Sequence, residues 1–303
     1  EAAPAIIEEI TAKYWKPGVA NLAAGCSFWS PPEQCLATAK ELLQTNDPEI
    51  HKYGDVLGLP ELRKKLALKL KTENGIEGRE VMVTAGANQA FVNVVLALCD
   101  PGDSALVFAP YYFSHRVALD LCSVNMLVAD CDDELCPDVD LVKDYIQEAA
   151  EAGHPVKMVV VVSPGNPSGA VLSKKRMREL VHVCRENGVW LVSDETYENF
   201  LYDGAEHVSP TAPNGVINIF SFSKAYGMAG WRVGYVAYPP HLSTAMLKAQ
   251  DTIPTMAPIL SQKIALAALS AGSEWVKDKV AALTPSRDAI WDAVEPLNPI
   301  RSQ

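Results

Sequence analysis

The sequence lacks long apolar runs and an excess of positive charge. No apolar stretch approaches the roughly 20 residues that cross a bilayer, and no basic segment leads an apolar one at the N-terminus. Lys and Arg number 26 against 37 Asp and Glu, a net charge of -11, which disfavours nucleic acid and membrane surfaces as partners. We expect a cytoplasmic protein, and organelle targeting stays open because the sequence begins at Glu1 rather than Met.

Several metal and nucleotide motifs are also missing. The seven cysteines are scattered, odd in number and without a C-x-x-C pair, which predicts buried free thiols rather than a zinc site. The acidic segment 130–138 lacks the glycine turn and terminal Glu of a calcium loop. The turn after the strand 81–84 has neither a P-loop lysine nor G-x-G-x-x-G spacing. We therefore expect no metal, and a bound nucleotide is disfavoured.

Short apolar strands alternate with helices along the chain, which is typical of a mainly parallel sheet covered by helices on both faces. At 303 residues and 49% hydrophobic side chains, the chain exceeds the usual size of one core, so we expect one large domain and part of another. The predicted strands are 81–84, 105–109, 158–162, 189–193, 216–220 and 233–238; the predicted helices are 4–15, 33–45, one starting near Pro60, 91–98, 174–186, 241–271 interrupted at Pro254 and Pro258, and 274–293.

Lys224 and Arg232 lie between two strands that the pattern predicts to be buried. One interpretation is a solvated loop whose charged groups reach water. The other is a lysine that attacks a carbonyl carbon, which requires an unprotonated amine; a partly desolvated loop with a second cation lowers a lysine pKa in that direction. The small neighbours of Lys224, serines and glycines, would let a bulky ring lie against the backbone.

Residues 221–235 read Ser-Phe-Ser-Lys, then Gly-Met-x-Gly-Trp-Arg-Val-Gly-Tyr. This resembles the lysine signature of the class I/II aminotransferases, the fold-type-I pyridoxal-phosphate enzymes. The resemblance implies a three-layer α/β/α fold with a mainly parallel sheet and a second, smaller domain. It also implies that Lys224 binds pyridoxal 5'-phosphate covalently, and that Ser221, Ser223 and Arg232 contact the cofactor.

A second motif follows the strand 81–84, where Gly86 permits a tight turn and an apolar helix starts at once. The free N–H groups and the dipole of such a helix point at one spot, which suits a phosphate. Alone, the pattern favours an ordinary strand-to-helix turn. With Lys224 downstream, the resemblance implies that the backbone of Gly86, Ala87 and Asn88 binds the cofactor phosphate.

Two strand ends carry further candidates. Asn166 lies in a rigid Pro-Gly-Asn-Pro loop at a carboxyl end, where α/β sheets bind ligands. Asp194 ends a buried strand, where a carboxylate is costly unless paired. The resemblance implies that Asp194 pairs with the protonated ring nitrogen, that Asn166 and Tyr197 bond the phenolic oxygen, and that Asn166 also contacts the substrate carboxylate. Lys224, Asp194 and Tyr197 are the predicted catalytic residues.

Aromatic residues complete the predicted pocket. A pyridine ring needs a flat partner on one face, and we select Tyr112 for it, with Tyr111 as the second choice. The resemblance implies that Gly25 lies against the substrate, although Gly25-Cys26-Ser27 replaces the family's Gly-x-Pro. Trp29 is a further predicted substrate contact. Tyr53 matches a tyrosine that reaches the partner subunit's phosphate, which implies a homodimer.

The predicted organisation is an N-terminal arm with part of the small domain (1–48), a large cofactor-binding domain (49–290) and the start of the C-terminal small domain (291–303). In the family, a later block of that domain carries an arginine that binds the substrate carboxylate. Arg301 lies too early for this role, so we expect the small domain to be incomplete in this chain.

The predicted activity is transfer of an amino group between an amino acid and a 2-oxo acid. Phe28, Trp29, Tyr111 and Tyr112 suggest an aromatic-rich pocket, and the motifs are similar to those of plant-type aromatic or methionine aminotransferases. We therefore predict aromatic amino acids and methionine as amino donors, since binding of aspartate would require a second basic residue in the pocket. A carbon-sulfur β-lyase or a cyclopropane-carboxylate synthase would use the same motifs. A non-catalytic homologue is the alternative from another class.

Overall fold

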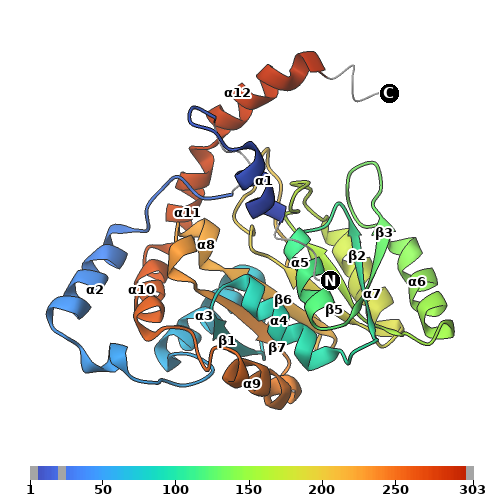
Figure 1. Cartoon of the computed structure of the whole chain (residues 1–303), viewed down its shortest axis with the longest axis horizontal. Helices are drawn as coiled ribbons and strands as arrows, with labels where there is room; N and C mark the ends of the chain where they lie inside the picture. The colour runs from blue at the N-terminus through green and yellow to red at the C-terminus, as the bar shows by residue number, and fades with distance from the viewer. Residues whose placement is uncertain (1–5, 20–24, 298–303) are drawn as a thin grey trace.

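A computed structural model describes residues 6–19 and 25–297, and in this part of the chain one seven-stranded sheet forms the centre (Figure 1). The strand order is β1-β7-β6-β5-β4-β2-β3, and β7 runs antiparallel to both of its neighbours while the other pairings are parallel. The strands are β1 Glu80–Thr84, β2 Ser104–Ala109, β3 Asn125–Asp130, β4 Val156–Val162, β5 Trp190–Asp194, β6 Val216–Ser221 and β7 Gly234–Tyr238.

Helices cover both faces of the sheet, which confirms the predicted three-layer α/β/α class (Figure 1). They are α1 Ile6–Tyr14, α2 Glu33–Gln44, α3 Pro60–Asn74, α4 Ala87–Leu98, α5 Phe113–Leu121, α6 Val139–Glu151, α7 Lys174–Glu186, α8 Phe222–Ala225, α9 Ser243–Thr252, α10 Ile259–Leu269, α11 Gly272–Ala281 and α12 Thr284–Val294. No helix in the described ranges has both the length and the apolar character needed to span a bilayer.

Alternation along the strands explains the layers. Met158 and Val160 of β4 pack with α4 and α5, whereas Val159 and Val161 pack with α6 and α7, because successive side chains of a strand point to opposite faces. All four are buried, and each contributes about 1.5–3 kcal/mol by leaving water. The unbroken apolar run predicted for 158–162 therefore marks a strand covered on both sides.

Local signals set several helix ends. α7 matches the predicted range 174–186 because the Ser173 hydroxyl accepts the Arg176 N–H (3.2 Å) at its start. α3 begins at Pro60 and ends before Gly75, whose φ of 67° suits a glycine. The predicted interruption of 241–271 is also confirmed, since α9 and α10 flank Pro254 and Pro258.

The prediction of one helix over 274–293 is wrong. The structure has two helices, α11 and α12, which meet at residues 282–283. Pro285 lies in the first turn of α12; it has no N–H to donate to Ala281, so the ladder of α11 cannot pass through it. Among the helices and strands, α5, β3, α6 and the short helix α8 were not anticipated. The domain boundaries 1–48, 49–290 and 291–303 remain a prediction.

Candidate active site

The predicted site residues gather at one edge of the sheet. β1, β4, β5 and β6 end there, and pairing of Val162 with Asp194, and of Thr84 and Ser221 with Gly234, places these ends at one level. Parallel strands bring their carboxyl ends to the same edge, where α/β proteins bind ligands. The segments holding Gly86, Tyr112, Asn166, Lys224 and Arg232 all leave the sheet at this edge.

Lys224 lies on α8, a short helix directly after β6. Ser221 caps this helix, its hydroxyl accepting the Ser223 N–H (3.1 Å). The Lys224 amine donates a hydrogen bond to the Gly25 carbonyl. Burial lowers the pKa of Lys224, and the nearby positive charge of Arg232 lowers it further, against an opposing effect of Cys26. The lysine is therefore readier to act as a nucleophile than a solvated one.

Gly86 and Arg232 form the second part of the site. Gly86 precedes α4 with a φ of 96°, and a Cβ at this position would lie 2.5 Å from Arg232 Nη2. The guanidinium thus rests against the backbone at the start of α4, where it donates to Ala85 O (3.1 Å) and Ala229 O (2.9 Å). A helix N-terminus and a guanidinium side by side make a seat for a doubly charged anion.

Asp194 is held by a residue that the sequence analysis missed, His115. The His115 Nε2 lies 3.2 Å from Asp194 Oδ2, both side chains are buried, and the imidazole stacks on Phe91 with ring centroids 4.1 Å apart. Burial alone raises the pKa of Asp194, but the hydrogen bond and charge of His115, with bonds from Thr196, bring that pKa below its usual value. A lone histidine 79 residues away gave no sequence signal for this contact.

Tyr197 and Asn166 also meet at the site. Asn166 Nδ2 donates to the Tyr197 hydroxyl (3.3 Å), and burial raises the pKa of Tyr197 to about 12. A Cβ at Gly25 would lie 3.6 Å from the Lys224 amine and 3.9 Å from the Tyr197 hydroxyl. Tyr112 donates to the Asn88 side chain (3.3 Å), so the aromatic residue contacts the start of α4. The polar groups of Lys224 and Tyr197 therefore face one space beside Gly25.

Trp29 is placed differently from the other candidates. Its side chain is 7% exposed, it stacks on Phe200 (6.1 Å between ring centroids), and its indole N–H donates to Ala225 O (3.3 Å). A Cβ at Gly227 would lie 2.5 Å from Trp29 O, so the two segments are in close contact. Trp29 thus packs under the lysine loop, and its substrate contact stays a prediction.

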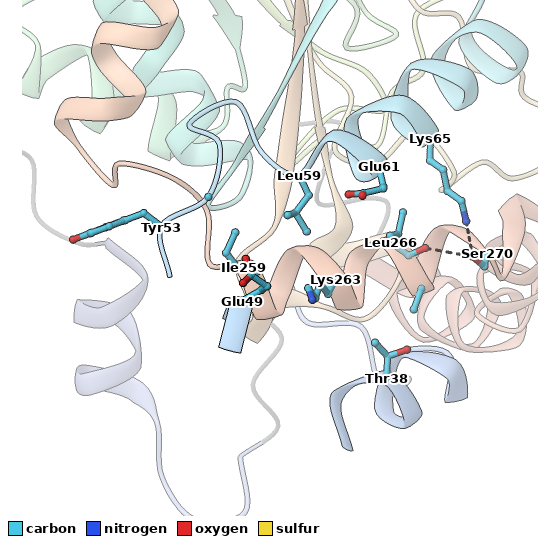
Figure 2. Close-up of a pocket in the computed structure, with 12 residues that line it drawn as sticks. Thr38, Glu49, Tyr53, Leu59, Glu61, Lys65, Ile259, Lys263, Leu266 and Ser270 are labelled. Carbon is cyan, nitrogen blue, oxygen red and sulfur yellow. Dashed lines mark hydrogen bonds between the residues drawn. The ribbon is translucent and has the colours of Figure 1, made fainter. Parts of the chain in front are cut away.

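Tyr53 lies away from this edge, at a separate cavity of about 690 Å³ (Figure 2). The cavity is bounded by η1 (Pro48–His51), α2, α3 and α10, and Lys65, Lys263, Glu49 and Glu61 contribute its charged groups. The Tyr53 ring points outward in Figure 2 and is 85% exposed. None of the catalytic candidates lines this cavity, so its size does not mark it as the reaction site.

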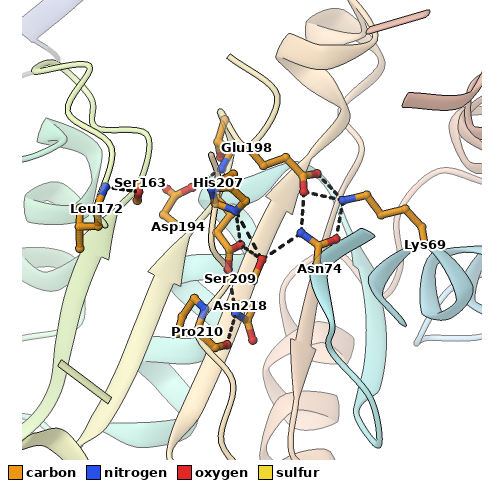
Figure 3. A network of polar contacts seen from close by, with 12 residues as sticks. Lys69, Asn74, Ser163, Leu172, Asp194, Glu198, His207, Ser209, Pro210 and Asn218 are labelled. Atoms are coloured by element: carbon orange, nitrogen blue, oxygen red, sulfur yellow. Dashed lines mark hydrogen bonds and ion pairs between the residues drawn. The ribbon is translucent and has the colours of Figure 1, made fainter. Parts of the chain in front are cut away.

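A buried polar network supports the turn that carries Asp194 and Tyr197 (Figure 3). Glu195 is fully buried and accepts from Asn218 Nδ2 (2.7 Å), from the Ser209 hydroxyl and, at 2.7 Å, from His207. The next residues extend it: Lys69 and Asn74 at the end of α3 bond Glu198 (2.5 Å and 2.8 Å). Buried carboxylates are costly unless bonded in this way. Of the residues in this turn, the sequence analysis predicted a functional role only for Asp194 and Tyr197.

Comparison with known proteins identifies the family of this chain. The family model for aminotransferase class I and II matches residues 18–303. The aromatic aminotransferase ISS1 of Arabidopsis thaliana is 44% identical, over 91% of this chain and 70% of its own length. An aspartate aminotransferase of Pyrococcus abyssi is 35% identical, over 77% of this chain and 60% of its own length. The chain thus spans about 60–70% of these two relatives.

Solved structures agree with the fold. The aspartate aminotransferase of Thermus thermophilus with maleate has a TM-score of 0.89 at 31% identity, covering 98% of this chain and 79% of that one. The aromatic aminotransferase of Pyrococcus horikoshii has a TM-score of 0.82 at 32% identity, covering 90% and 74%. With the lysine motif, the strand-edge site and these likenesses together, the chain belongs to the class I and II aminotransferase family.

Proposed function

We propose that the protein is a pyridoxal-phosphate-dependent aminotransferase that moves an amino group between an aromatic amino acid or methionine and a 2-oxo acid. The observation that carries the proposal is the convergence of the Lys224 amine, the buried Asp194 carboxylate and the Gly86 turn with Arg232 at one edge of the sheet. An amine, an acid and an anion seat are the three groups that this cofactor requires of a protein.

The residues present fit the cofactor. Gly86 has no Cβ where the Arg232 guanidinium lies, and α4 starts there with amides that lack partners one turn back. Gly86, Ala87 and Asn88 would bind the phosphate through the backbone, with Ser221, Ser223 and Arg232 beside them. When bound, pyridoxal phosphate supplies a cationic ring that withdraws electrons from the substrate's Cα. Lys224 would hold it covalently.

Each polar side chain at the site has a separate role in the proposed reaction. Asp194, with a depressed pKa, remains a carboxylate and holds a proton on the ring nitrogen. Asn166 and Tyr197, 3.3 Å apart, would donate to the cofactor's phenolic oxygen, and Tyr112 would lie against the ring. Once the substrate's amine has displaced it, the Lys224 amine would take the proton from the substrate's Cα and deliver it to the cofactor's C4', a role for which its lowered pKa suits it.

The substrate preference rests on two supports. A relative 44% identical to this chain is an aromatic aminotransferase, and Phe28, 73% exposed, packs edge-on against Trp29 at 5.3 Å between centroids beside Gly25. Gly25, Trp29 and Asn166 are the proposed substrate contacts. Aspartate aminotransferases among the relatives make aspartate the competing donor to test.

We also propose a homodimer in which Tyr53 contacts the phosphate bound by the partner subunit. Its ring is 85% exposed and points away from the other labelled residues of the cavity (Figure 2), so it is accessible to a neighbouring subunit. Sedimentation equilibrium of the wild-type protein tests the stoichiometry. Tyr53→Phe, which removes one hydroxyl, should weaken cofactor binding without changing that stoichiometry.

The function is tested by adding pyridoxal phosphate to the protein, recording the visible absorbance of the bound cofactor, and reducing with borohydride. The label should appear on the peptide containing Lys224 and be absent from Lys224→Ala. Phenylalanine, methionine and aspartate are then offered separately with a 2-oxo acid. Amino exchange supports the proposal, whereas release of ammonia and pyruvate from a cysteine conjugate would identify a β-lyase. A wild-type protein that takes up no cofactor would refute it.

A further inference from the structure

Three side-chain amides lie directly behind the Gly86 turn: Gln89 and Asn93 of α4, and Gln250 of α9. We refer to them as the amide cluster. Gln89 Nε2 donates to Asn93 Oδ1 (2.8 Å) and to Gln250 Oε1 (2.7 Å), and Asn93 Nδ2 donates to the same Gln250 oxygen (2.8 Å). Asn93 and Gln250 are fully buried. Each amide thereby fixes the orientation of the others.

The amide cluster ends on the backbone of β1 and the turn that follows. Gln89 Oε1 accepts the Ala85 N–H (2.7 Å), and Gln250 Nε2 donates to Val83 O (3.0 Å). Leaving a buried polar group without its hydrogen-bond partner costs about 1–3 kcal/mol, so this arrangement of the three side chains is energetically favoured. The cluster thus connects α9 to the last residues of β1.

Three successive peptide groups of the turn are each fixed through one polar atom. The first is held by Gln89 through the Ala85 N–H. The second is held by Arg232 through Ala85 O (3.1 Å). The third is held through Gly86 O, which accepts from the Thr84 hydroxyl (2.9 Å) and the Ala90 N–H (3.2 Å). Because a peptide group is planar and trans, fixing its carbonyl aims the N–H on its other side.

The N–H groups aimed in this way belong to Gly86 and Ala87, two of the three residues of the proposed phosphate seat. Arg232 holds the second peptide from the ligand side, whereas the amide cluster holds the first from behind the sheet edge. Displacement of the first peptide would shift the Ala85 Cα, an atom that belongs to both peptide planes, and would move the second peptide with it. The geometry therefore assigns the amide cluster a direct mechanical connection to the seat.

We propose that Gln89, Asn93 and Gln250 are positioning residues that aim the backbone amides of the phosphate seat, an inference that rests on the proposed function. They act through Ala85 and not by contacting the ligand. Their effect should be confined to the phosphate group, because Lys224 and Asp194 are held by other contacts, the Gly25 carbonyl and His115. A general loss of packing would instead weaken every ligand alike.

The test compares two ligands that differ by the phosphate, pyridoxal 5'-phosphate and pyridoxal, by titration followed through absorbance. Gln89→Met removes the acceptor for the Ala85 N–H at nearly constant volume, and Gln250→Met removes the anchor on Val83; either one suffices if the other fails to fold. The matched control is Gln262→Met, a fully buried glutamine of α10 with two backbone partners, Leu59 N and Ala257 O (each 2.7 Å).

We expect the cluster variants to bind pyridoxal phosphate on the order of tenfold more weakly and pyridoxal as the wild type does, whereas Gln262→Met keeps the wild-type ratio. Equal weakening of both ligands, or unchanged binding of both, overturns the inference while leaving cofactor binding intact. Inorganic phosphate provides an arm independent of the cofactor: it should raise the thermal midpoint of the wild type and of Gln262→Met but not of Gln89→Met. If the wild type binds neither pyridoxal ligand, the proposed function fails, and the phosphate arm still decides the inference.

Discussion

Replacement of His115 by Phe should leave Asp194 as a buried carboxylate without its hydrogen-bonded partner. The phenyl ring can keep the stacking on Phe91, 4.1 Å from the imidazole it replaces, so the change removes mainly the 3.2 Å bond to Asp194. Removing one partner of a buried hydrogen bond costs about 1–3 kcal/mol, and more where the group left behind is charged. We expect about 3 kcal/mol, because Asp194 is a carboxylate but keeps its bond from the Thr196 N–H (3.0 Å).

The same reasoning predicts that a second substitution rescues part of this loss. Asp194→Asn removes the charge and should cost about 1.5 kcal/mol alone, as a lost charge-assisted hydrogen bond does. In the double variant no buried charge remains unpaired. We therefore expect His115→Phe with Asp194→Asn to be no less stable than His115→Phe alone, a coupling of at least about 1.5 kcal/mol.

Urea unfolding of the four cofactor-free proteins measures this cycle. With a slope of about 3 kcal/mol/M, His115→Phe should lower the midpoint by about 1 M. The control is His154→Phe. The His154 imidazole bonds Ser104 at the start of β2, the end of the strand that lies away from Asp194. The stability losses of His154→Phe and Asp194→Asn should therefore add. Additivity within about 0.5 kcal/mol for the His115 pair as well would refute the argument that His115 stabilises the buried Asp194 carboxylate.

Three further predictions concern the buried charges. Glu195→Gln should lower the free energy of unfolding by about 3 kcal/mol, because the new amide group would face hydrogen-bond donors in a fully buried site. The control Glu179→Gln, on the surface, should change the thermal midpoint little. Equal effects of the two substitutions would contradict this prediction. The pKa of Asp194 lies below its usual 3.8, so its stabilisation is present above that value and is lost as the pH falls through the folded pKa. Asp194→Asn should therefore flatten the acid limb of a plot of urea midpoint against pH, and an unchanged limb would disprove the assignment. The pKa of Lys224 is lowered from 10.5, so its burial costs stability below the folded pKa, and this cost fades as the pH rises toward 10.5. In the cofactor-free protein, Lys224→Met should therefore have a higher thermal midpoint than the wild type at about pH 7.5, and the difference should be smaller at about pH 10. A difference that does not change with pH would count against the shift.

Much of the fold was predictable because its elements are locally encoded. The apolar run 158–162, the cap at Ser173 and the prolines at 254 and 258 each act over a few residues, and the structure has the corresponding elements. The single helix expected over 274–293 is wrong for a reason that is also local: Pro285 has no N–H to continue the helix before it, which is itself a signal in the sequence.

The sequence by itself determined the family motif around Lys224, most of the strands and helices in their order, and the glycine turn at Gly86, since these depend on neighbours along the chain. The tertiary structure alone decided which distant residues meet. His115 reaches Asp194 across 79 positions, Gln250 reaches Gln89 across 161, and Trp29 is buried beneath the lysine loop. Strand order accounts for two of these contacts: β7 lies beside β1, which brings Gln250 near Gln89, and β2 and β5 flank β4, which brings His115 near Asp194. No local periodicity specifies that order, because its free energy comes from packing between elements far apart in the chain.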